Sequence, residues 1–199
     1  MTATILLVDD DPAVLDGLKR TLRAPDLTLL SALSAQEAVE LLHQHRVDVV
    51  VSDDSMPGIT GLDFLAQIRV LFPAILRIML TGKATVERMA QALNEGLVFR
   101  FLSKPCPADV LAEAVRHAVE QKLLMDRGRD ALALIRRHIA VLQYLEQNHP
   151  QVLTAALDAV AGLHIAPTDF VGATQLADEM DVQIKTLTGL HPAITLPVK

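Results

Sequence analysis

The sequence predicts an α/β fold in which helices cover both faces of a parallel sheet of five strands. Short, continuous apolar runs recur five times in residues 1–124, and such runs are typical of strands buried on both faces. Segments with apolar residues at helical spacing separate these runs, so strands and helices alternate along the chain. After about residue 124 only helical patterns remain, which predicts an all-α C-terminal module.

The first part of the alternating region contains three strands and the starts of two helices. Asp11 and Pro12 suit the cap and the first residue of a helix, and residues 34–37 (SAQE) form a capping box that starts another. The expected strands are residues 3–8 (ATILLV), 27–31 (LTLLS) and 47–52 (VDVVVS).

The rest of this region supplies two more strands and three helices. Pro73 lies just past one helix, and Asn94 to Gly96 are typical of the end of another. A last helix follows Lys104 and Pro105. The expected strands are residues 75–80 and 98–102, and the expected helices before the last are residues 60–71 and 84–96.

Composition and charge narrow the class of protein. The 199 residues carry a net charge of −6, which argues against binding to nucleic acid, because nucleic acid selects basic surfaces. The single cysteine, Cys106, excludes an internal disulfide framework and fits a reducing compartment; we interpret it as a small apolar filler. The N-terminus lacks the pattern of a signal peptide and no apolar run could span a bilayer. We therefore expect a soluble, cytoplasmic protein with no membrane insertion.

Acidic side chains gather where the predicted strands end. Asp9 and Asp10 follow the first strand, and Asp53 and Asp54 follow the third. In the flavodoxin-like strand order 2-1-3-4-5 these two strands are neighbours, so their carboxylates converge at the carboxyl edge of the sheet. Converging carboxylates need a cation, and a hard divalent ion such as Mg²⁺ suits oxygen ligands.

Two further strand ends complete the pattern. Thr81 follows the fourth strand with a hydroxyl, and Lys104 follows the fifth with a positive charge. A metal ion and a lysine together neutralise the oxygens of a phosphoryl group. A carboxylate can itself be the nucleophile and form an aspartyl phosphate. The pattern therefore predicts a phosphoryl site.

These motifs resemble the receiver domain of two-component response regulators over residues 3–123. The matching segments are LLVDDD, SDDSMPGITGLDFL, IMLTG and FRFLSKP. The segment NEGLVFRFLSKP is especially similar to receivers attached to cyclic-di-GMP phosphodiesterases of the HD-GYP type. The resemblance implies a sensor histidine kinase as the phosphoryl donor, and no enzymatic activity beyond Mg²⁺-dependent self-phosphorylation and autodephosphorylation.

The resemblance also implies a role for individual residues. Asp53, three residues before Met56, is the phosphoacceptor. Asp9 and Asp10 form the acidic pair that holds Mg²⁺, with Asp10 the more direct ligand, and Asp53 and the Ser55 carbonyl complete the protein's ligands. Thr81 and Lys104 contact the phosphoryl oxygens. Phe101 matches the aromatic residue that swings inward when the threonine engages the phosphate.

Asp54 and Phe101 depart from the usual pattern, and Lys83 lies at a position that in the family helps to set the lifetime of the phosphate. Asp54 adds a second acid beside the phosphoacceptor, although neighbours on an extended chain face opposite sides, so its carboxylate either tunes the site or points away from it. Phe101 lacks the hydroxyl of the commoner tyrosine. We hypothesise that Lys83, two residues after Thr81, shields the phosphate and slows its hydrolysis; a solvated lysine is the alternative.

The C-terminal module, residues 125–199, has no motif of a known output enzyme. Residues 126–130 (DRGRD) predict a break after the preceding helix, although that helix could also continue as one rod with Gly128 as its weak point. An apolar stripe at spacings of three and four predicts either an intrachain bundle or, preferably, a homodimer interface; it comprises Leu132, Ile135, Ile139, Leu142 and Leu145.

The residues leave three functions open. The first is a response regulator (domain 1–124) that switches contacts with an unidentified downstream protein, or dimerisation, through its helical module (125–199). The second is a regulatory receiver linked to cyclic-di-GMP phosphodiesterase signalling, with the catalytic part absent or supplied by a partner. A transcription factor with an unusual helical output domain is a weaker third.

Overall fold

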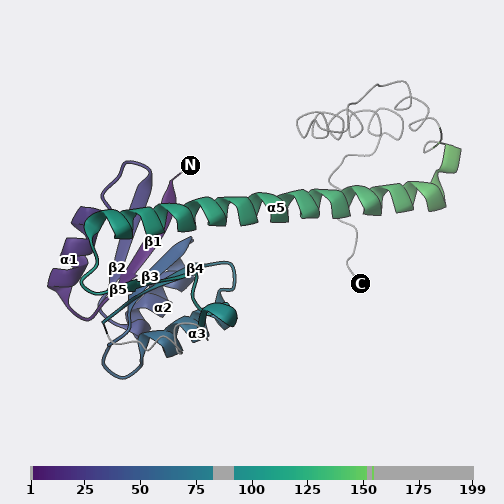
Figure 1. Ribbon diagram of the computed structural model, residues 1–199. Coiled ribbons are helices and arrows are strands. Elements are labelled where there is room, and N and C mark those ends of the chain that lie inside the picture. Colours follow the sequence, from purple (N-terminus) through teal and green to yellow (C-terminus); the bar gives the residue numbers. More distant parts are fainter. Residues whose placement is uncertain (1, 83–91, 152–153, 155–199) are drawn as a thin grey trace. The chain divides into compact units, whose positions relative to one another are not determined.

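The computed structural model describes residues 2–82, 92–151 and 154, and Figure 1 shows the arrangement of their helices and strands. The strands are β1 (Ala3–Val8), β2 (Leu27–Ala32), β3 (Val49–Asp53), β4 (Leu76–Thr81) and β5 (Arg100–Ser103). The helices are α1 (Pro12–Thr21), α2 (Ala35–Gln44), α3 (Gly61–Leu71) and α5 (Ala108–Asn148).

The strands form one parallel sheet in the order β2-β1-β3-β4-β5, which confirms the predicted topology. The chain order reverses beside β1, so β1 and β3 lie side by side at the switch point. Val8 of β1 pairs with Ser52 of β3, and Asp53 pairs with Leu80 of β4. The acidic residues that follow β1 and end β3 are therefore placed at the same edge of the sheet.

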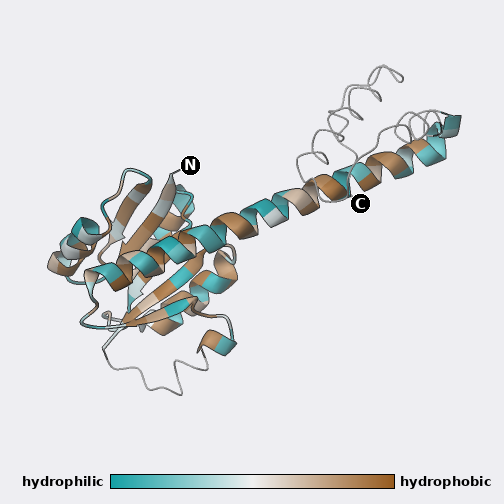
Figure 2. Ribbon diagram, turned by 45° about the horizontal axis from the view of Figure 1, so that its top comes forward, coloured by the Kyte–Doolittle hydropathy of each residue, from teal (hydrophilic) through white to brown (hydrophobic). Residues whose placement is uncertain are grey.

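Two apolar layers cover the sheet, because successive side chains of each strand point to opposite faces. Leu6, Val50 and Met79 face one cluster, which Phe64 and Ile68 of α3 join together with residues of α2. The other face is covered by α1 and the first part of α5; its cluster includes Ile5, Leu7, Val49, Val51, Ile78, Leu15, Leu111 and Val115. Figure 2 shows the corresponding concentration of hydrophobic residues in the strands.

The helix starts agree with the sequence. Asp11 accepts a hydrogen bond from the Ala13 N–H at 2.8 Å and Pro12 is the first residue of α1. Ser34 accepts from the Glu37 N–H at 3.1 Å, and the Glu37 carboxylate in turn accepts from the Leu33 N–H. These side chains satisfy backbone donors that the first turn of a helix leaves without partners.

The predicted break at residues 126–130 is wrong, since α5 is one helix from Ala108 to Asn148. A helical glycine costs only about 1 kcal/mol relative to alanine, which is too little to end a long helix. The Lys122 ammonium also contacts the Asp126 carboxylate one turn later, at 2.6 and 2.7 Å, and supports the helix on the near side of Gly128. The alternative prediction, in which the preceding helix continues through Gly128, agrees with the extent of α5.

Contacts within the chain divide it into two compact units, residues 1–128 and 129–199, so the division falls inside α5. In the second unit the structure describes residues 129–151 and 154, and those after Pro150 are helical. The helix expected over residues 84–96 is seen at residues 92–94, and the rest of it lies outside the described residues, as does most of the C-terminal module.

Arg77 is a charged residue in the otherwise apolar strand β4, and only 7% of it is exposed. Its guanidinium donates to the carbonyls of Ile75, Leu97 and Gly96 at 2.6, 2.7 and 3.0 Å. Burial, and then the charge of Arg69, lower the pKa of Arg77. Arg77 thus ties β4 to the turn that precedes β5.

Within residues 2–82, 92–151 and 154, no helix combines the length and apolar character that crossing a membrane requires.

Candidate functional site

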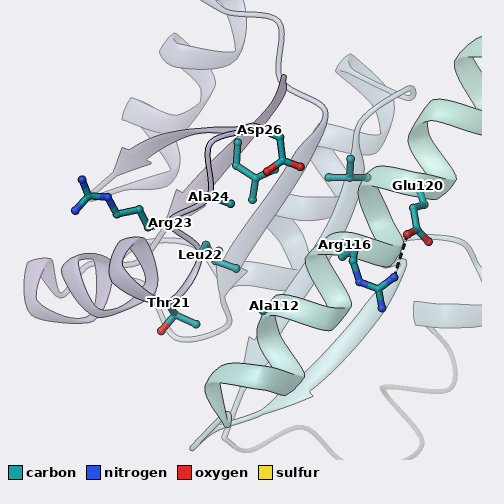
Figure 3. Close-up of a pocket in the computed structure, with 10 residues that line it drawn as sticks. Thr21, Leu22, Arg23, Ala24, Asp26, Ala112, Arg116 and Glu120 are labelled. Atoms are coloured by element: carbon teal, nitrogen blue, oxygen red, sulfur yellow. Dashed lines mark hydrogen bonds and ion pairs between the residues drawn. The ribbon is translucent and has the colours of Figure 1, made fainter. Parts of the chain in front are cut away.

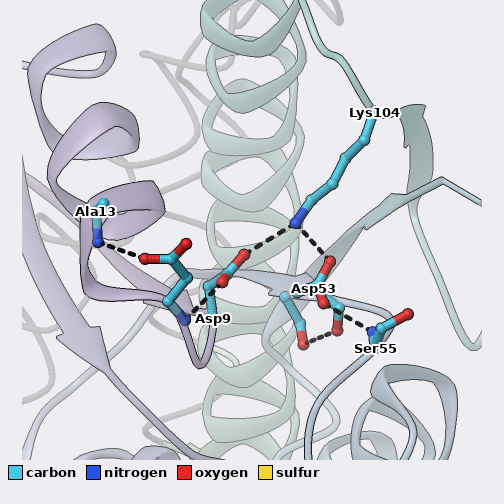
Figure 4. A network of polar contacts seen from close by, with 7 residues as sticks. Asp9, Ala13, Asp53, Ser55 and Lys104 are labelled. Atoms are coloured by element: carbon cyan, nitrogen blue, oxygen red, sulfur yellow. Dashed lines mark hydrogen bonds and ion pairs between the residues drawn. The ribbon is translucent and has the colours of Figure 1, made fainter.

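Two buried carboxylates and one lysine meet at the carboxyl edge of the sheet (Figure 4). The Lys104 ammonium contacts Oδ1 of Asp53 at 2.6 Å and Oδ2 of Asp9 at 2.9 Å. Asp9 is 3% exposed and Asp53 is 6% exposed, so solvent screens these ion pairs weakly. The structure therefore brings together three of the residues that the sequence predicts from three separate strand ends.

Backbone groups hold the two carboxylates in place. The second oxygen of Asp53 accepts a hydrogen bond from the Ser55 N–H at 2.7 Å, and the second oxygen of Asp9 accepts from the Asp11 N–H at 3.0 Å. Each carboxylate thus has one oxygen bound to the main chain and the other directed to Lys104. Such bonds restrict both side chains before any ligand arrives.

The position and charge of Lys104 follow from its surroundings. Its N–H donates to the Thr81 carbonyl at 2.8 Å, which continues the pairing of β4 and β5 by one residue, and the Lys104–Pro105 peptide bond is cis. Burial alone would lower the pKa of Lys104, but hydrogen bonds to Asp53 and Asp9, and then the charges of both, outweigh it. The pKa of Lys104 is therefore raised, and the ammonium stays charged at neutral pH.

Asp54 does not point away from the site. Its Oδ2 accepts a hydrogen bond from the Thr81 hydroxyl at 3.0 Å, and Thr81 is 4% exposed. The simple alternation of side chains along a strand fails here because β3 ends at Asp53, and Asp54 lies in the turn that follows. Of the two interpretations from the sequence, the one in which Asp54 affects the site agrees with this contact.

The remaining predicted residues surround this centre. Asp10 is exposed, beside the buried Asp9. Ser55 is exposed and pairs through its backbone with Thr60. Phe101 is half-buried and packs against the cluster that contains α2 and α3. Lys83 lies outside the described residues.

The donor set suits a hard cation such as Mg²⁺, because it consists of carboxylate and carbonyl oxygens. Among the described residues, however, no three histidine, cysteine, aspartate or glutamate side chains are already grouped as a metal site. Lys104 supplies the positive charge between Asp9 and Asp53 instead. Asp10, which the resemblance assigns as a further ligand, is exposed to solvent beside Asp9.

Gly61 is a part of the site that the sequence analysis missed. A Cβ at this position would lie 2.0 Å from the Asp53 carbonyl oxygen and 2.7 Å from the Asp54 Cα. The Gly61 N–H also donates to the Asp54 carbonyl at 2.9 Å. The start of α3 therefore touches the backbone that carries both acids, and only glycine fits. The segment ITGLDF contains this glycine directly after the helix cap Thr60, but one sequence does not reveal the contact.

A separate cleft of about 550 Å³ lies between the end of α1 and α5 (Figure 3). It is lined by residues between Thr21 and Leu27 and by Ala112, Arg116, Val119 and Glu120 of α5. Arg116 and Glu120 form an ion pair at 3.0 Å at this cleft. None of the predicted site residues lines it.

A doubly wound sheet with buried acids and a lysine at its switch point is typical of phosphoryl-accepting signalling domains. The family model for the response regulator receiver domain matches residues 5–116, and the chain belongs to this family. The resemblance inferred from the sequence is thereby confirmed.

Known relatives agree with this assignment. The hydrogenase transcriptional regulatory protein HoxA of Cupriavidus necator is 39% identical over 118 residues, which are 59% of this chain and 24% of HoxA. The transcriptional regulatory protein GlrR of Escherichia coli is 34% identical over 145 residues, which are 73% of this chain and 32% of GlrR. The chain thus spans about a quarter to a third of the length of these relatives.

Among solved structures, the signal receiver domain of an HD domain-containing protein from Pseudomonas fluorescens Pf-5 is 37% identical, with a TM-score of 0.58. The match covers 61% of this chain and 98% of that one. It supports the predicted resemblance to receivers of HD-GYP-type proteins as far as the HD domain, which is what its name states. The match lies within the receiver fold, so it assigns nothing to the rest of the chain.

Proposed function

We propose that Asp53 accepts a phosphoryl group from a sensor histidine kinase and that the chain acts as a phosphorylation-dependent switch. The observation that carries this proposal is the convergence of buried Asp53 and Asp9 on the Lys104 ammonium at the sheet's switch point. The family assignment supports it. The sensor kinase CckA of Brucella abortus also has a matching segment, 36% identical over 123 residues, which are 61% of this chain and 13% of CckA.

The proposed reaction uses Asp53, Lys104 and Thr81 in the positions that the structure gives them. Oδ1 of Asp53 attacks the phosphorus of the kinase's phosphohistidine, so that a P–O bond forms while the P–N bond breaks and the histidine imidazole leaves; Oδ2 stays bound to the Ser55 N–H. Lys104 then neutralises a phosphoryl oxygen, and the Thr81 hydroxyl donates to another. Asp9, Asp10, Asp53 and the Ser55 carbonyl would hold Mg²⁺, which when bound supplies further charge neutralisation for the phosphoryl oxygens.

The test is binding of beryllofluoride, which stands in for the phosphoryl group, with Mg²⁺ and ¹⁹F NMR as the readout. We expect bound fluorine signals for the wild type and none for Asp53→Asn. The matched control is Asp16→Asn, which removes an exposed carboxylate on α1 and should bind like the wild type. Equal signals in the wild type and Asp53→Asn would contradict the assignment of Asp53.

We further propose that the second half of α5 forms a homodimer interface. Leu132, Ile135 and Ile139 are 58%, 53% and 49% exposed, and Leu142 continues the same spacing. Spacings of three and four repeat from Leu132 to Leu145, which is the heptad pattern of a coiled coil, although Leu145 itself is only 2% exposed. A second copy of this helix is the partner that such a pattern fits, and phosphorylation could then act on assembly.

Light scattering tests the dimer. Ile135→Glu should give a monomer, because it places a charge in the repeat, whereas Leu134→Glu should leave the wild-type mass unchanged. Leu134 is also exposed (38%) and only one residue away, but it is outside the repeat. A monomeric wild type, or equal effects of both variants, would exclude this interface. The dimer and the phosphoryl site are separate proposals, so either can fail alone.

Regulation of a cyclic-di-GMP phosphodiesterase is a second candidate output. It is supported by the similarity to the receiver of an HD domain-containing protein. Both HoxA and GlrR are instead named as transcriptional regulators, although the net charge of −6 speaks against direct DNA binding by this chain. Phosphodiesterase activity of a candidate partner, measured with the beryllofluoride-bound chain and with Asp53→Asn, would separate the two outputs.

A further inference from the structure

We propose that Asp54 holds the receiver in its unphosphorylated state by binding the Thr81 hydroxyl, so that phosphorylation must take this hydroxyl away from Asp54. This proposal rests on the proposed phosphorylation of Asp53. It assigns to Asp54 the role of a positioning residue, which acts on the phosphoryl group through Thr81.

The first support is the contact itself. The Thr81 hydroxyl donates to Oδ2 of Asp54 at 3.0 Å, and Thr81 is 4% exposed. A hydroxyl carries one proton. The proton that it gives to Asp54 must be redirected before it can serve an oxygen of a phosphoryl group on Asp53. Hydrogen bonds to a charged acceptor are stronger than those between neutral groups. Breaking the bond from Thr81 to Asp54 therefore costs free energy, which the bond from Thr81 to the phosphoryl oxygen must offset.

The second support is that Asp54 is held from both sides. Its N–H donates to the Leu80 carbonyl at 3.0 Å, and its carbonyl accepts from the Gly61 N–H at 2.9 Å. A bond to Leu80 places Asp54 beside the residue that precedes Thr81. The lack of space for a Cβ at Gly61 further fixes the Asp53–Asp54 backbone. The backbone that carries the Asp54 carboxylate is therefore fixed close to Thr81.

Asp54 affects a phosphoryl group in two ways that an experiment must separate. Its negative charge repels the incoming anion whether or not Thr81 is present. Its hydrogen bond acts only through the Thr81 hydroxyl. A double-mutant cycle between positions 54 and 81 cancels the charge effect and leaves the part that depends on Thr81.

The experiment measures the dissociation constant of beryllofluoride with saturating Mg²⁺ by ¹⁹F NMR, for the full chain. The variants are Asp54→Ala, Asp54→Asn, Thr81→Ala and the double variant Asp54→Ala/Thr81→Ala. We expect Asp54→Ala to bind about tenfold tighter than the wild type, which corresponds to the loss of one charge-assisted hydrogen bond and one like charge. Asp54→Asn keeps an acceptor oxygen for Thr81 and should gain less.

The cycle decides the proposal. In the Thr81→Ala background, replacement of Asp54 should tighten binding by about threefold or less, compared with about tenfold in the wild type. The hydroxyl is gone there, so only the charge effect remains. Equal gains in both backgrounds would overturn the role of Asp54 through Thr81 and leave Asp53 as the phosphoacceptor. Absence of Asp53-dependent binding in the wild type would overturn the proposed function itself, and this proposal with it.

Urea unfolding of each variant checks that the comparison is made between folded proteins. Should Asp54→Ala not fold, Asp54→Leu, which is close to aspartate in shape but has no acceptor oxygen, forms the same cycle with Thr81→Ala. A coupling factor of one in that second cycle would likewise overturn the proposal.

Discussion

Replacement of Gly61 by alanine tests the claim that α3 presses directly on the backbone of the two acids. The new Cβ would lie 2.0 Å from the Asp53 carbonyl oxygen, 2.9 Å from its carbon and 2.7 Å from the Asp54 Cα. Carbon and oxygen atoms that are not bonded keep more than 3 Å apart, so α3 and the end of β3 must separate by at least about 1 Å.

Neither side of this contact can yield easily. The Gly61 N–H is bonded to the Asp54 carbonyl, and the Asp54 N–H is bonded to the carbonyl of Leu80 in strand β4. On the helix side, Phe64, Leu65 and Ile68 are fully buried against the sheet. Overpacking of a well-packed interior costs about 1–3 kcal/mol, and a clash between two backbones belongs at the upper end. We therefore expect Gly61→Ala to lower the free energy of unfolding by about 3 kcal/mol.

Urea unfolding followed by circular dichroism measures this change, and Gly17→Ala is the matched control. Gly17 lies inside α1, and a Cβ there would meet nothing within 4 Å. The same substitution should therefore raise the stability by about 0.5–1 kcal/mol, because alanine favours a helix over glycine. A loss of less than 1 kcal/mol in Gly61→Ala would refute the reasoning, since the two backbones could then separate at little cost.

Three other sites give shorter predictions. Arg77→Met leaves the carbonyls of Ile75, Gly96 and Leu97 without their donor and should lower the free energy of unfolding in urea by about 2–3 kcal/mol. Arg77→Lys should recover only part of this loss. An unchanged unfolding midpoint would exclude the role given to Arg77. Burial, and then the charge of Asp109, raise the pKa of the Cys106 thiol. Alkylation at pH 8 should therefore be slower than for an exposed thiol, and its rate should still be rising above pH 9.0, where the rate of an ordinary thiol levels off. Asp109→Asn should speed the reaction at pH 8, and reaction as fast as glutathione would contradict the shift. Asp126→Ala removes the two short contacts between Asp126 and Lys122, which is 6% exposed, together with the ion pair between Asp126 and Arg46, and should destabilise the first unit by about 1–3 kcal/mol. Lys122→Met should cost less, because it removes the buried charge itself.

Much of the receiver fold could be predicted because its signals are local. Apolar runs mark the strands, and the caps at Asp11 and Ser34 mark two helices; the structure agrees with both. The alternation of strands and helices predicts a parallel sheet, whereas the order 2-1-3-4-5 is the flavodoxin-like assumption under which the carboxylates at two strand ends converge. The boundaries were less predictable, because Asp53 and Thr81 are the last residues of β3 and β4, whereas both were expected just beyond them. A polar residue at a strand end resembles the start of a loop when only the sequence is read.

Features that depend on the third dimension were not predictable. Gly61 resembles any glycine at a helix start, and the pairing of Arg77 with three carbonyls needs a turn twenty residues away. The contact between Asp54 and Thr81 joins residues 27 positions apart across two strands. The predicted break near Gly128 failed for another reason: charge and glycine are weak helix breakers when the residues on both sides favour a helix.

The fixed backbone of Asp53 and Asp54 explains how a phosphoryl group on Asp53 would change the structure at a distance from the site. Asp53 and Asp54 share a backbone that is bonded to β4 on one side and to the start of α3 on the other. Thr81 ends β4 and Lys104 directly follows β5, and the two are joined through the bond between the Lys104 N–H and the Thr81 carbonyl. A phosphoryl group on Asp53 would attract the Thr81 hydroxyl and the Lys104 ammonium, while the backbone of Asp53 and Asp54 stays fixed. The ends of β4 and β5 are therefore the parts that can respond, and β5 leads through Ser103 and Lys104 into α5, whose exposed apolar repeat is the proposed dimer interface.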